Sequence, residues 1–478
     1  MKNRAFFYNA YLFVLTALIL SGVFSVSAQT VSDVDAVVQK LAESKQIPGA
    51  AVAVVRDGKI ILAKGYGAEN IETKTPADEN TVYEIASVTK QFTAAAIMLL
   101  VEDDKIKLDD ALGKYLTDVP ESWQAVTIRQ LLNQVSGIPN YTAAGKIRIE
   151  KKYAPEEILQ MVADMPLEFA PGTRWQYSNT NYFLLGLVIE KVSKKSYAEF
   201  MKERIFKPLK MNSTQINTSG LKIEKKAVSY SINKDGWKKE INADPSQPFA
   251  AGAVVSTASD MAKWALALES EKLLKKNSLN EIWTAAKLSD GKTTDYGFGW
   301  QISKIGETDF VEHNGGIAGF TSHILRFPNE NLSVAVMVNT GTPATRKLAY
   351  EIAGLYLPKF GAAVAGREKK ASQTLADKDE ATTKFLRETF EKMIAGTVDQ
   401  NLFTPEMQKL LFPDRVAQLK SFLGTQGAIK SFDLVEDSSD ESIKRRAYRV
   451  SFDRLKVRIS FAVNAEGIIT GVNLRPEQ

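Results

Sequence analysis

The chain of 478 residues contains no cysteine and only two histidines, His313 and His323. The absence of cysteine excludes disulfides, thiolate nucleophiles, cysteine zinc sites and a lipidated cysteine anchor. Two histidines without a third ligand beside them make a weak metal pair, so we expect no metal and no cofactor. The stretch from Gly315 to Gly319 resembles a phosphate loop, but no helix is predicted after it. The chemistry must therefore come from oxygen and nitrogen side chains.

The chain also has no large excess of positive or negative charge. The chain has 61 lysines and arginines against 56 aspartates and glutamates, which gives a net charge of +5. So mild and dispersed a charge argues against nucleic acid as a partner. A hydrophobic share of 44% with 24% charged residues is typical of a globular enzyme and not of a disordered chain.

Apolar runs are too short for the roughly 20 residues that span a bilayer. The main candidate, centred on Leu12 to Leu20, follows Lys2 and Arg4 and precedes Val26-Ser27-Ala28. This order is typical of a cleaved signal peptide. We expect residues 1–28 to be removed, leaving no stable membrane span and a periplasmic or secreted protein. An uncleaved membrane anchor is the alternative.

The length suggests two domains. In residues 29–360, two β-runs joined by Asp57-Gly58 predict a hairpin, and helical and strand patterns follow. Residues 361–376 show neither period and predict an irregular linker. Residues 377–478 predict a separate α+β accessory domain, whose partner the sequence does not reveal. Its expected helices and strands cover residues 383–394, 405–423, 447–452, 456–463 and 468–474.

One stretch places a nucleophile and a base at the start of a helix. Ser87 stands where an extended run gives way to an alanine-rich helical one, and Lys90 follows three residues later on the same face. The positive end of the helix dipole favours negative charge at this point. Ser-x-x-Lys also occurs at Ser219, Ser231 and Ser289, but among turn-forming residues. A simple helix-capping serine is the alternative for Ser87.

Two further motifs contain chemically useful side chains. Tyr177-Ser178-Asn179 follows a Pro-Gly turn and precedes an apolar helix. Alone, it is also compatible with a packed loop tyrosine and an asparagine that caps the helix. His313-Asn314-Gly315-Gly316 lies just before a predicted strand over residues 321–327.

Together, Ser87-Val88-Thr89-Lys90, Tyr177-Ser178-Asn179 and His313-Asn314-Gly315 resemble the three ordered motifs of the serine β-lactamase and penicillin-binding-protein family. The branch they resemble most contains class C β-lactamases, D-alanyl-D-alanine carboxypeptidases and esterases. The resemblance covers about residues 32–357. It implies an α/β (α+β) fold of the β-lactamase/transpeptidase type: a sandwich with an antiparallel sheet and a helical subdomain, with the site between them.

The resemblance also implies an exported serine hydrolase that forms an acyl-enzyme on Ser87. Lys90 and Tyr177 would share the proton, and either could be the base. The residues expected to bind the substrate are Asn179, His313, Gly315 and Gly316. Asn179 would hold Lys90 and the substrate, and His313 would orient a substrate carboxylate or the leaving group. The backbone N–H groups of Ser87 and Gly316 would form an oxyanion hole.

Three departures from the family pattern affect the expected substrate. His313 stands where many relatives have lysine, Asn314 replaces a hydroxyl residue, and Gln134 replaces a histidine. The histidine at position 313 favours peptidase, aminopeptidase or esterase relatives over an efficient class C β-lactamase, and Asn314 favours weaker recognition of a carboxylate. The residue pattern offers no physical account of the change at Gln134. We expect a small-molecule or peptide substrate: a D-amino-acid peptide, such as one derived from peptidoglycan, a small ester or a β-lactam. A penicillin-binding sensor, or a binding protein of the cell envelope without turnover, is the alternative.

Overall fold

The computed structural model describes residues 30–476 except 44–45, 234–235, 425, 439, 441 and 454. The predicted signal peptide lies outside the described residues. The chain divides into two compact units between Val364 and Ala365. Within the described residues, no helix has both the length and the apolar surface that crossing a membrane requires.

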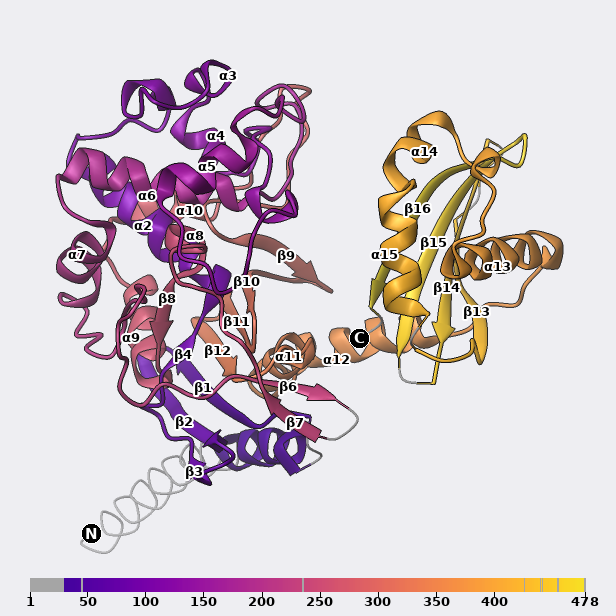
Figure 1. Ribbon diagram of the computed structural model, residues 1–478. Coiled ribbons are helices and arrows are strands. Elements are labelled where there is room, and N and C mark those ends of the chain that lie inside the picture. Colours follow the sequence, from indigo (N-terminus) through magenta and orange to yellow (C-terminus); the bar gives the residue numbers. More distant parts are fainter. Residues whose placement is uncertain are drawn as a thin grey trace, which may run out of the picture. The chain divides into compact units, whose positions relative to one another are not determined.

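A seven-stranded antiparallel sheet forms the centre of the first unit, in the order β3-β2-β1-β12-β11-β10-β9 (Figure 1). Its strands are β1 (Gly49–Arg56), β2 (Lys59–Asn70), β3 (Thr75–Pro76), β9 (Gln301–Ile305), β10 (Thr308–Ile317), β11 (Phe320–Phe327) and β12 (Leu332–Val338). The predicted Asp57-Gly58 hairpin is confirmed, because it joins β1 to β2. Strand β1 also pairs with β12, so segments far apart in sequence close the sheet.

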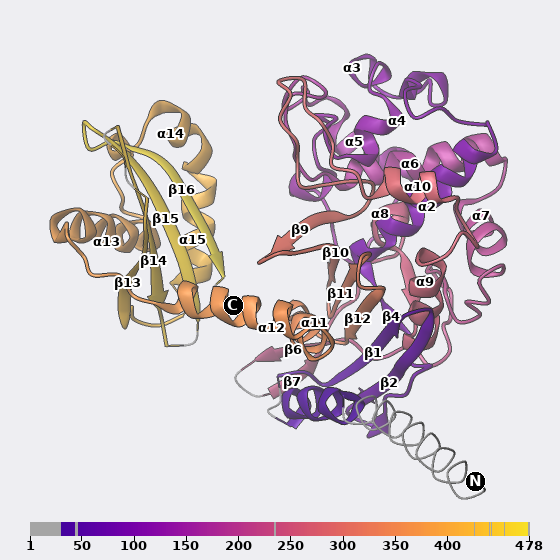
Figure 2. The same ribbon diagram turned by 180° about the vertical axis from the view of Figure 1, so that it is seen from behind.

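Helices cover both faces of this sheet, because alternate side chains of a strand point to opposite faces. Val52 and Val54 of β1 join one hydrophobic core with the helix over residues 30–43 and α11 (Ala344–Tyr356). Ala51, Ala53 and Val55 join the other core with α2 (Thr89–Glu102) and α9 (Ala258–Leu268). Figure 2 shows α11 and α9 on opposite sides of the strands. The expected sandwich with an antiparallel sheet is confirmed.

The segment between β4 (Tyr83–Glu84) and β9 contains the helical subdomain. Its other helices are α3 (Glu121–Gln124), α4 (Ile128–Leu132), α5 (Pro155–Ala163), α6 (Asn179–Ser193), α7 (Tyr197–Met201), α8 (Phe249–Gly252) and α10 (Lys276–Ile282). The short strands are β5 (Gln215–Ile216), β6 (Tyr230–Asn233), β7 (Gly236–Lys239) and β8 (Val254–Ser256). Helix α2 is buried at 12 of its 14 residues, so it forms the axis on which the subdomain packs.

The second unit packs helices on a four-stranded antiparallel sheet. Its elements are α13 (Glu380–Ala395), α14 (Pro405–Leu411), α15 (Asp414–Leu423), β13 (Ser431–Asp437), β14 (Ile443–Ser451), β15 (Lys456–Asn464) and β16 (Ile469–Pro476). The single helix expected over residues 405–423 is wrong. Pro413 interrupts it, because proline has no N–H for the helical hydrogen bond. Strand β13 was not expected.

The segment expected to be an irregular linker, residues 361–376, is also different from the prediction. Helix α12 (Pro358–Ser372) covers most of it. Gly361 and Gly366 suggested a break, but the alanine, glutamate and lysine residues around them favour a helix. Ala363 and Val364 anchor the start of this helix on the hydrophobic core that contains α11.

Candidate active site

Ser87 lies in a 3₁₀ turn, Ala86–Val88, between β4 and α2. Ala86 has φ of +45°, a left-handed conformation that is strained for any residue except glycine. Ser87 is half-buried. The residue that caps α2 is Val88, and no side chain makes a capping hydrogen bond there. The helix-capping alternative for Ser87 is therefore not supported.

Lys90 is fully buried, and its amine contacts three oxygens. Nζ lies 3.2 Å from Ser87 Oγ, 2.8 Å from Asn179 Oδ1 and 2.8 Å from the carbonyl oxygen of Ala251. Burial lowers the pKa of Lys90 well below the usual value of a lysine. Amide and carbonyl oxygens can only accept hydrogen bonds. The lowered pKa favours the neutral amine, and in that form Lys90 donates to both of these oxygens and turns its lone pair toward the Ser87 hydroxyl.

Tyr177 is the second side chain that is hydrogen-bonded to the Ser87 hydroxyl. Its OH donates to Ser87 Oγ at 2.9 Å, and Lys90 Nζ lies 4.8 Å from the centre of its ring. Burial raises the pKa of Tyr177 above the usual value of a phenol, although the bond to Ser87 opposes this. Tyr177 is therefore a proton donor at neutral pH. Asn179 Nδ2 donates to Thr142 Oγ1 at 3.2 Å, which leaves Oδ1 for Lys90.

Gln134 holds the loop that contains Tyr177. Its fully buried amide oxygen accepts from Ser178 N at 3.0 Å and from Asn181 Nδ2 at 2.6 Å. Its backbone oxygen accepts from Gln176 N at 2.9 Å. These bonds fix the chain on both sides of Tyr177. The departure from the family pattern at Gln134 thus has a structural role.

His313 lies on β10 and is 5% exposed. Its Nδ1 lies 2.6 Å from the Asn314 carbonyl oxygen, and its Nε2 lies 2.9 Å from the Tyr296 hydroxyl. The centres of the His313 and Tyr177 rings are 6.2 Å apart. Burial, and in second place the Lys90 amine, lower the pKa of His313 to about 3. The imidazole is therefore neutral at pH 7.

Glycine at position 315 lets β10 pack against the Ser87 turn. A Cβ added there would lie 2.2 Å from the Ile85 carbonyl oxygen and 2.4 Å from Ser322 Oγ, closer than atoms can approach. At Gly316 an added Cβ would meet open space. Gly316 borders the cavity at Ser87, whereas Gly315 determines how close the strand lies.

A cavity of about 150 Å³ opens at Ser87. The residues that line it are Ala86, Ser87, Tyr141, Thr142, Ile147, Asn179, Ala243, Gln247, Pro248, Ala251, Gly252, Gly316 and Ile317. Its lining includes Ser87, Asn179 and Gly316 of the predicted site residues. Lys90 and Tyr177 reach the cavity through Ser87, to which both are hydrogen-bonded.

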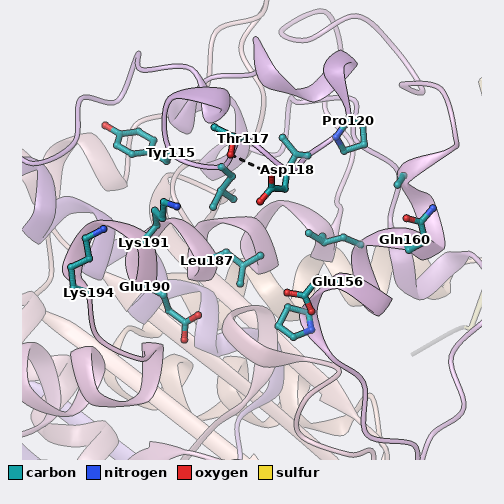
Figure 3. A pocket seen from close by; sticks show the side chains of 15 residues that line it. Tyr115, Thr117, Asp118, Pro120, Glu156, Gln160, Leu187, Glu190, Lys191 and Lys194 are labelled. Atoms are coloured by element: carbon teal, nitrogen blue, oxygen red, sulfur yellow. Dashed lines mark hydrogen bonds between the residues drawn. The ribbon is translucent and has the colours of Figure 1, made fainter.

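A larger cavity, of about 510 Å³, lies elsewhere in the helical subdomain, between α5, α6 and the loop over residues 115–120. Figure 3 shows Leu187 there among Glu156, Glu190 and Lys191. None of the predicted site residues lines it. The smaller cavity is therefore the candidate active site.

The structure brings Ser87, Lys90, Tyr177 and Asn179 into one hydrogen-bonded cluster, and His313 contacts it through the Tyr177 ring. Sequence reasoning did not identify Tyr296 or Thr142 as neighbours of these groups. The aromatic run Tyr296-Gly297-Phe298-Gly299-Trp300 was the available signal for Tyr296. Among the described residues, no cluster of three metal-binding side chains occurs.

Comparison with known proteins identifies relatives of this chain. A model of the family described as Beta-lactamase matches residues 34–356. A penicillin-binding protein of Bacillus subtilis (strain 168) is 28% identical over 446 residues, which is 85% of this chain and 97% of that protein. Protein flp of Staphylococcus aureus (strain MW2) is 28% identical over 66% of this chain, and the chain spans 64% of its length.

Solved structures of a penicillin-binding protein homologue and of an amidohydrolase are also similar to the chain. An octameric penicillin-binding protein homologue from Pyrococcus abyssi is 25% identical, covers 94% of this chain and 98% of its own, and has a TM-score of 0.62. A D-stereospecific amidohydrolase from Streptomyces sp. is 28% identical, covers 66% of this chain and 97% of its own, and has a TM-score of 0.56.

Proposed function

The chain belongs to the beta-lactamase family of serine hydrolases, and from this premise we propose that it hydrolyses its substrate through an acyl-enzyme on Ser87. The observation that carries the proposal is the position of the Ser87 hydroxyl between a buried amine and a buried phenol. One group can take the proton of the hydroxyl, and the other can give a proton. The proposed substrates are a D-amino-acid peptide or amide, a small ester or a β-lactam.

In the proposed acylation step, Lys90 is the base. The neutral amine takes the Ser87 proton while Oγ bonds to the substrate carbonyl carbon. Tyr177 then gives its proton to the leaving group as the carbonyl carbon loses that group. The Lys90 ammonium returns a proton to the tyrosinate, which restores both side chains. The lowered pKa of Lys90 and the raised pKa of Tyr177 favour this assignment over a tyrosinate base.

We assign the negative charge of the tetrahedral intermediate to the backbone N–H groups of Ser87 and Gly316. Both residues border the same cavity, as an oxyanion hole requires. Each such donor typically contributes about 3–4 kcal/mol to transition-state stabilisation. Water then attacks the acyl-enzyme with Lys90 again as the base. The Lys90 ammonium returns this proton to Ser87 Oγ as the bond between Oγ and the acyl carbon breaks, and the acid product leaves.

The cellular setting is also a proposal. The N-terminal pattern over residues 1–28 supports export, and with it a periplasmic or secreted location. Residues 29–360 would then form the mature hydrolase domain, and the second unit would be an accessory module.

The test compares the mature protein with its Ser87→Ala variant on four compounds: p-nitrophenyl acetate, a D-alanyl-D-alanine peptide, a chromogenic cephalosporin and a fluorescent penicillin. We expect turnover of at least one compound by the mature protein and none by the variant. Stable labelling without any turnover would instead support the sensor. Full activity of Ser87→Ala would overturn the assignment of the nucleophile.

A further inference from the structure

The walls of the cavity at Ser87 carry no charged side chain. Its thirteen lining residues all belong to the described part of the chain, and none is a lysine, arginine, histidine, aspartate or glutamate. Ile147, Pro248 and Ile317 give apolar surface, and Thr142 and Gln247 bring neutral polar groups. An ionised group that enters such a cavity loses water and gains no opposite charge.

His313 does not supply the missing charge. The Asn314 carbonyl oxygen can only accept, so Nδ1 of the neutral ring carries the hydrogen and donates it there. Nε2 is then the acceptor for the Tyr296 hydroxyl. Both ring nitrogens are engaged within the protein, so the imidazole offers a substrate neither a positive charge nor a free N–H.

Lys90 and Lys146 are also engaged within the protein. The three oxygens on Lys90 Nζ take all of its hydrogen-bonding capacity, and the side chain is fully buried. Lys146, next to Ile147 in sequence, donates its amine to the Met161 carbonyl oxygen at 2.8 Å and does not line the cavity. A carboxylate beside the reacting carbonyl would therefore find no cation in the walls.

Resting on the hydrolase proposed above, we propose that this site selects acyl donors that are uncharged on both sides of the scissile bond, namely neutral esters and amides. Donors with a carboxylate next to that bond, such as β-lactams and peptides whose terminal residue leaves with a free carboxylate, are discriminated against. The uncharged walls of the cavity, with apolar side chains at Ile147 and Ile317, set this selectivity.

The test uses two aryl esters of similar shape, neutral 3-carbamoylphenyl acetate and anionic 3-carboxyphenyl acetate. They share the acyl group and nearly share the shape of the leaving group. We expect kcat/KM of the mature protein, after subtraction of the Ser87→Ala background, to be about tenfold or more higher for the neutral ester. Equal values, or a preference for the carboxylate, would overturn the inference and leave the hydrolase intact. Turnover of neither ester would also overturn the inference, and it would contradict the proposed hydrolase only if none of the four compounds tested above is turned over.

A pair of charge insertions tests the cause of the selectivity. Ile147→Lys places an amine at the cavity wall, and Ile149→Lys places the same group two residues away, on an exposed position that does not line the cavity. We expect Ile147→Lys to reduce the preference for the neutral ester several-fold and Ile149→Lys to leave it unchanged. An equal response of the two variants would contradict the assignment to the uncharged walls. Ile147 is half-buried and Ile149 is exposed, so we expect both variants to fold.

Discussion

Lys90 Nζ lies 3.2 Å from Ser87 Oγ, while its two other contacts are oxygens that can only accept. Burial lowers the pKa of any lysine, and in this arrangement the neutral amine also has a defined orientation. Burial favours the neutral amine, and the two acceptors determine where its lone pair points. The Tyr177 hydroxyl, 2.9 Å from the same Oγ, completes a chain of hydrogen bonds from phenol to serine to amine.

Replacing Lys90 with methionine keeps most of the side-chain volume and removes the base. We expect kcat/KM with p-nitrophenyl acetate to fall by about 10²–10⁴-fold, since this is the usual contribution of a general base. The matched control is Lys292→Met, because Lys292 also follows a serine by three residues but is exposed. Similar losses in both variants, or no loss in Lys90→Met, would contradict the role of Lys90.

The pH dependence of activity should follow the protonation state of Lys90. The neutral amine is the active form, so activity rises as pH increases through the lowered pKa of Lys90 and is lost below it. His313, with a pKa of about 3, should add no step between pH 5 and 8. A profile of kcat/KM against pH checks the statement about Lys90. An acid limb near the ordinary lysine value of 10.5 would contradict it.

Gln134 should matter for stability and for the position of Tyr177. Gln134→Ala leaves the Ser178 N–H and the Asn181 amide without their buried acceptor, which costs about 1–3 kcal/mol. Urea denaturation followed by tryptophan fluorescence measures this, because all six tryptophans lie in the first unit. The exposed Gln160→Ala is the control and should change stability little. If both variants unfold at the same urea concentration, the loop is not held by Gln134.

Glu312 and His323 of the sheet form a cluster with Arg346 of α11. This cluster should make the stability of the first unit sensitive to acid. Burial alone would raise the pKa of Glu312, but contacts with His323, Arg346 and Ser303 overcome this and hold it at about 2. The folded value lies below the usual 4.5, so the stabilisation is complete above that pH and is lost as pH falls toward 2. At roughly 1.4 kcal/mol per unit of pKa, the loss should be about 3 kcal/mol.

The variant Glu312→Gln tests this account, because it cannot titrate. Urea denaturation of both proteins at several pH values between 5 and 2 should show a smaller loss of stability with acid in the variant. Equal slopes in the two proteins would contradict the role given to Glu312.

The sequence predicted those parts of the molecule that depend on local patterns. The Ser87–Lys90 pair follows from helical spacing, and the β1–β2 hairpin follows from its Asp-Gly turn. The approach of Tyr177, 90 residues away from Ser87, came only from resemblance to a family, because local spacing says nothing about such contacts. The roles of Tyr296 and Gln134 were not predicted for the same reason: they depend on tertiary contacts with His313 and the Tyr177 loop.

Mass spectrometry of the acylated protein tests the central claim most directly. The protein is mixed with p-nitrophenyl acetate, stopped with acid within the first turnover, digested and analysed by peptide. An acetyl group on Ser87, absent from the Ser87→Ala variant, is the predicted result. Turnover of the ester with no acetyl group on Ser87, or with the group on another residue, would contradict the proposed mechanism.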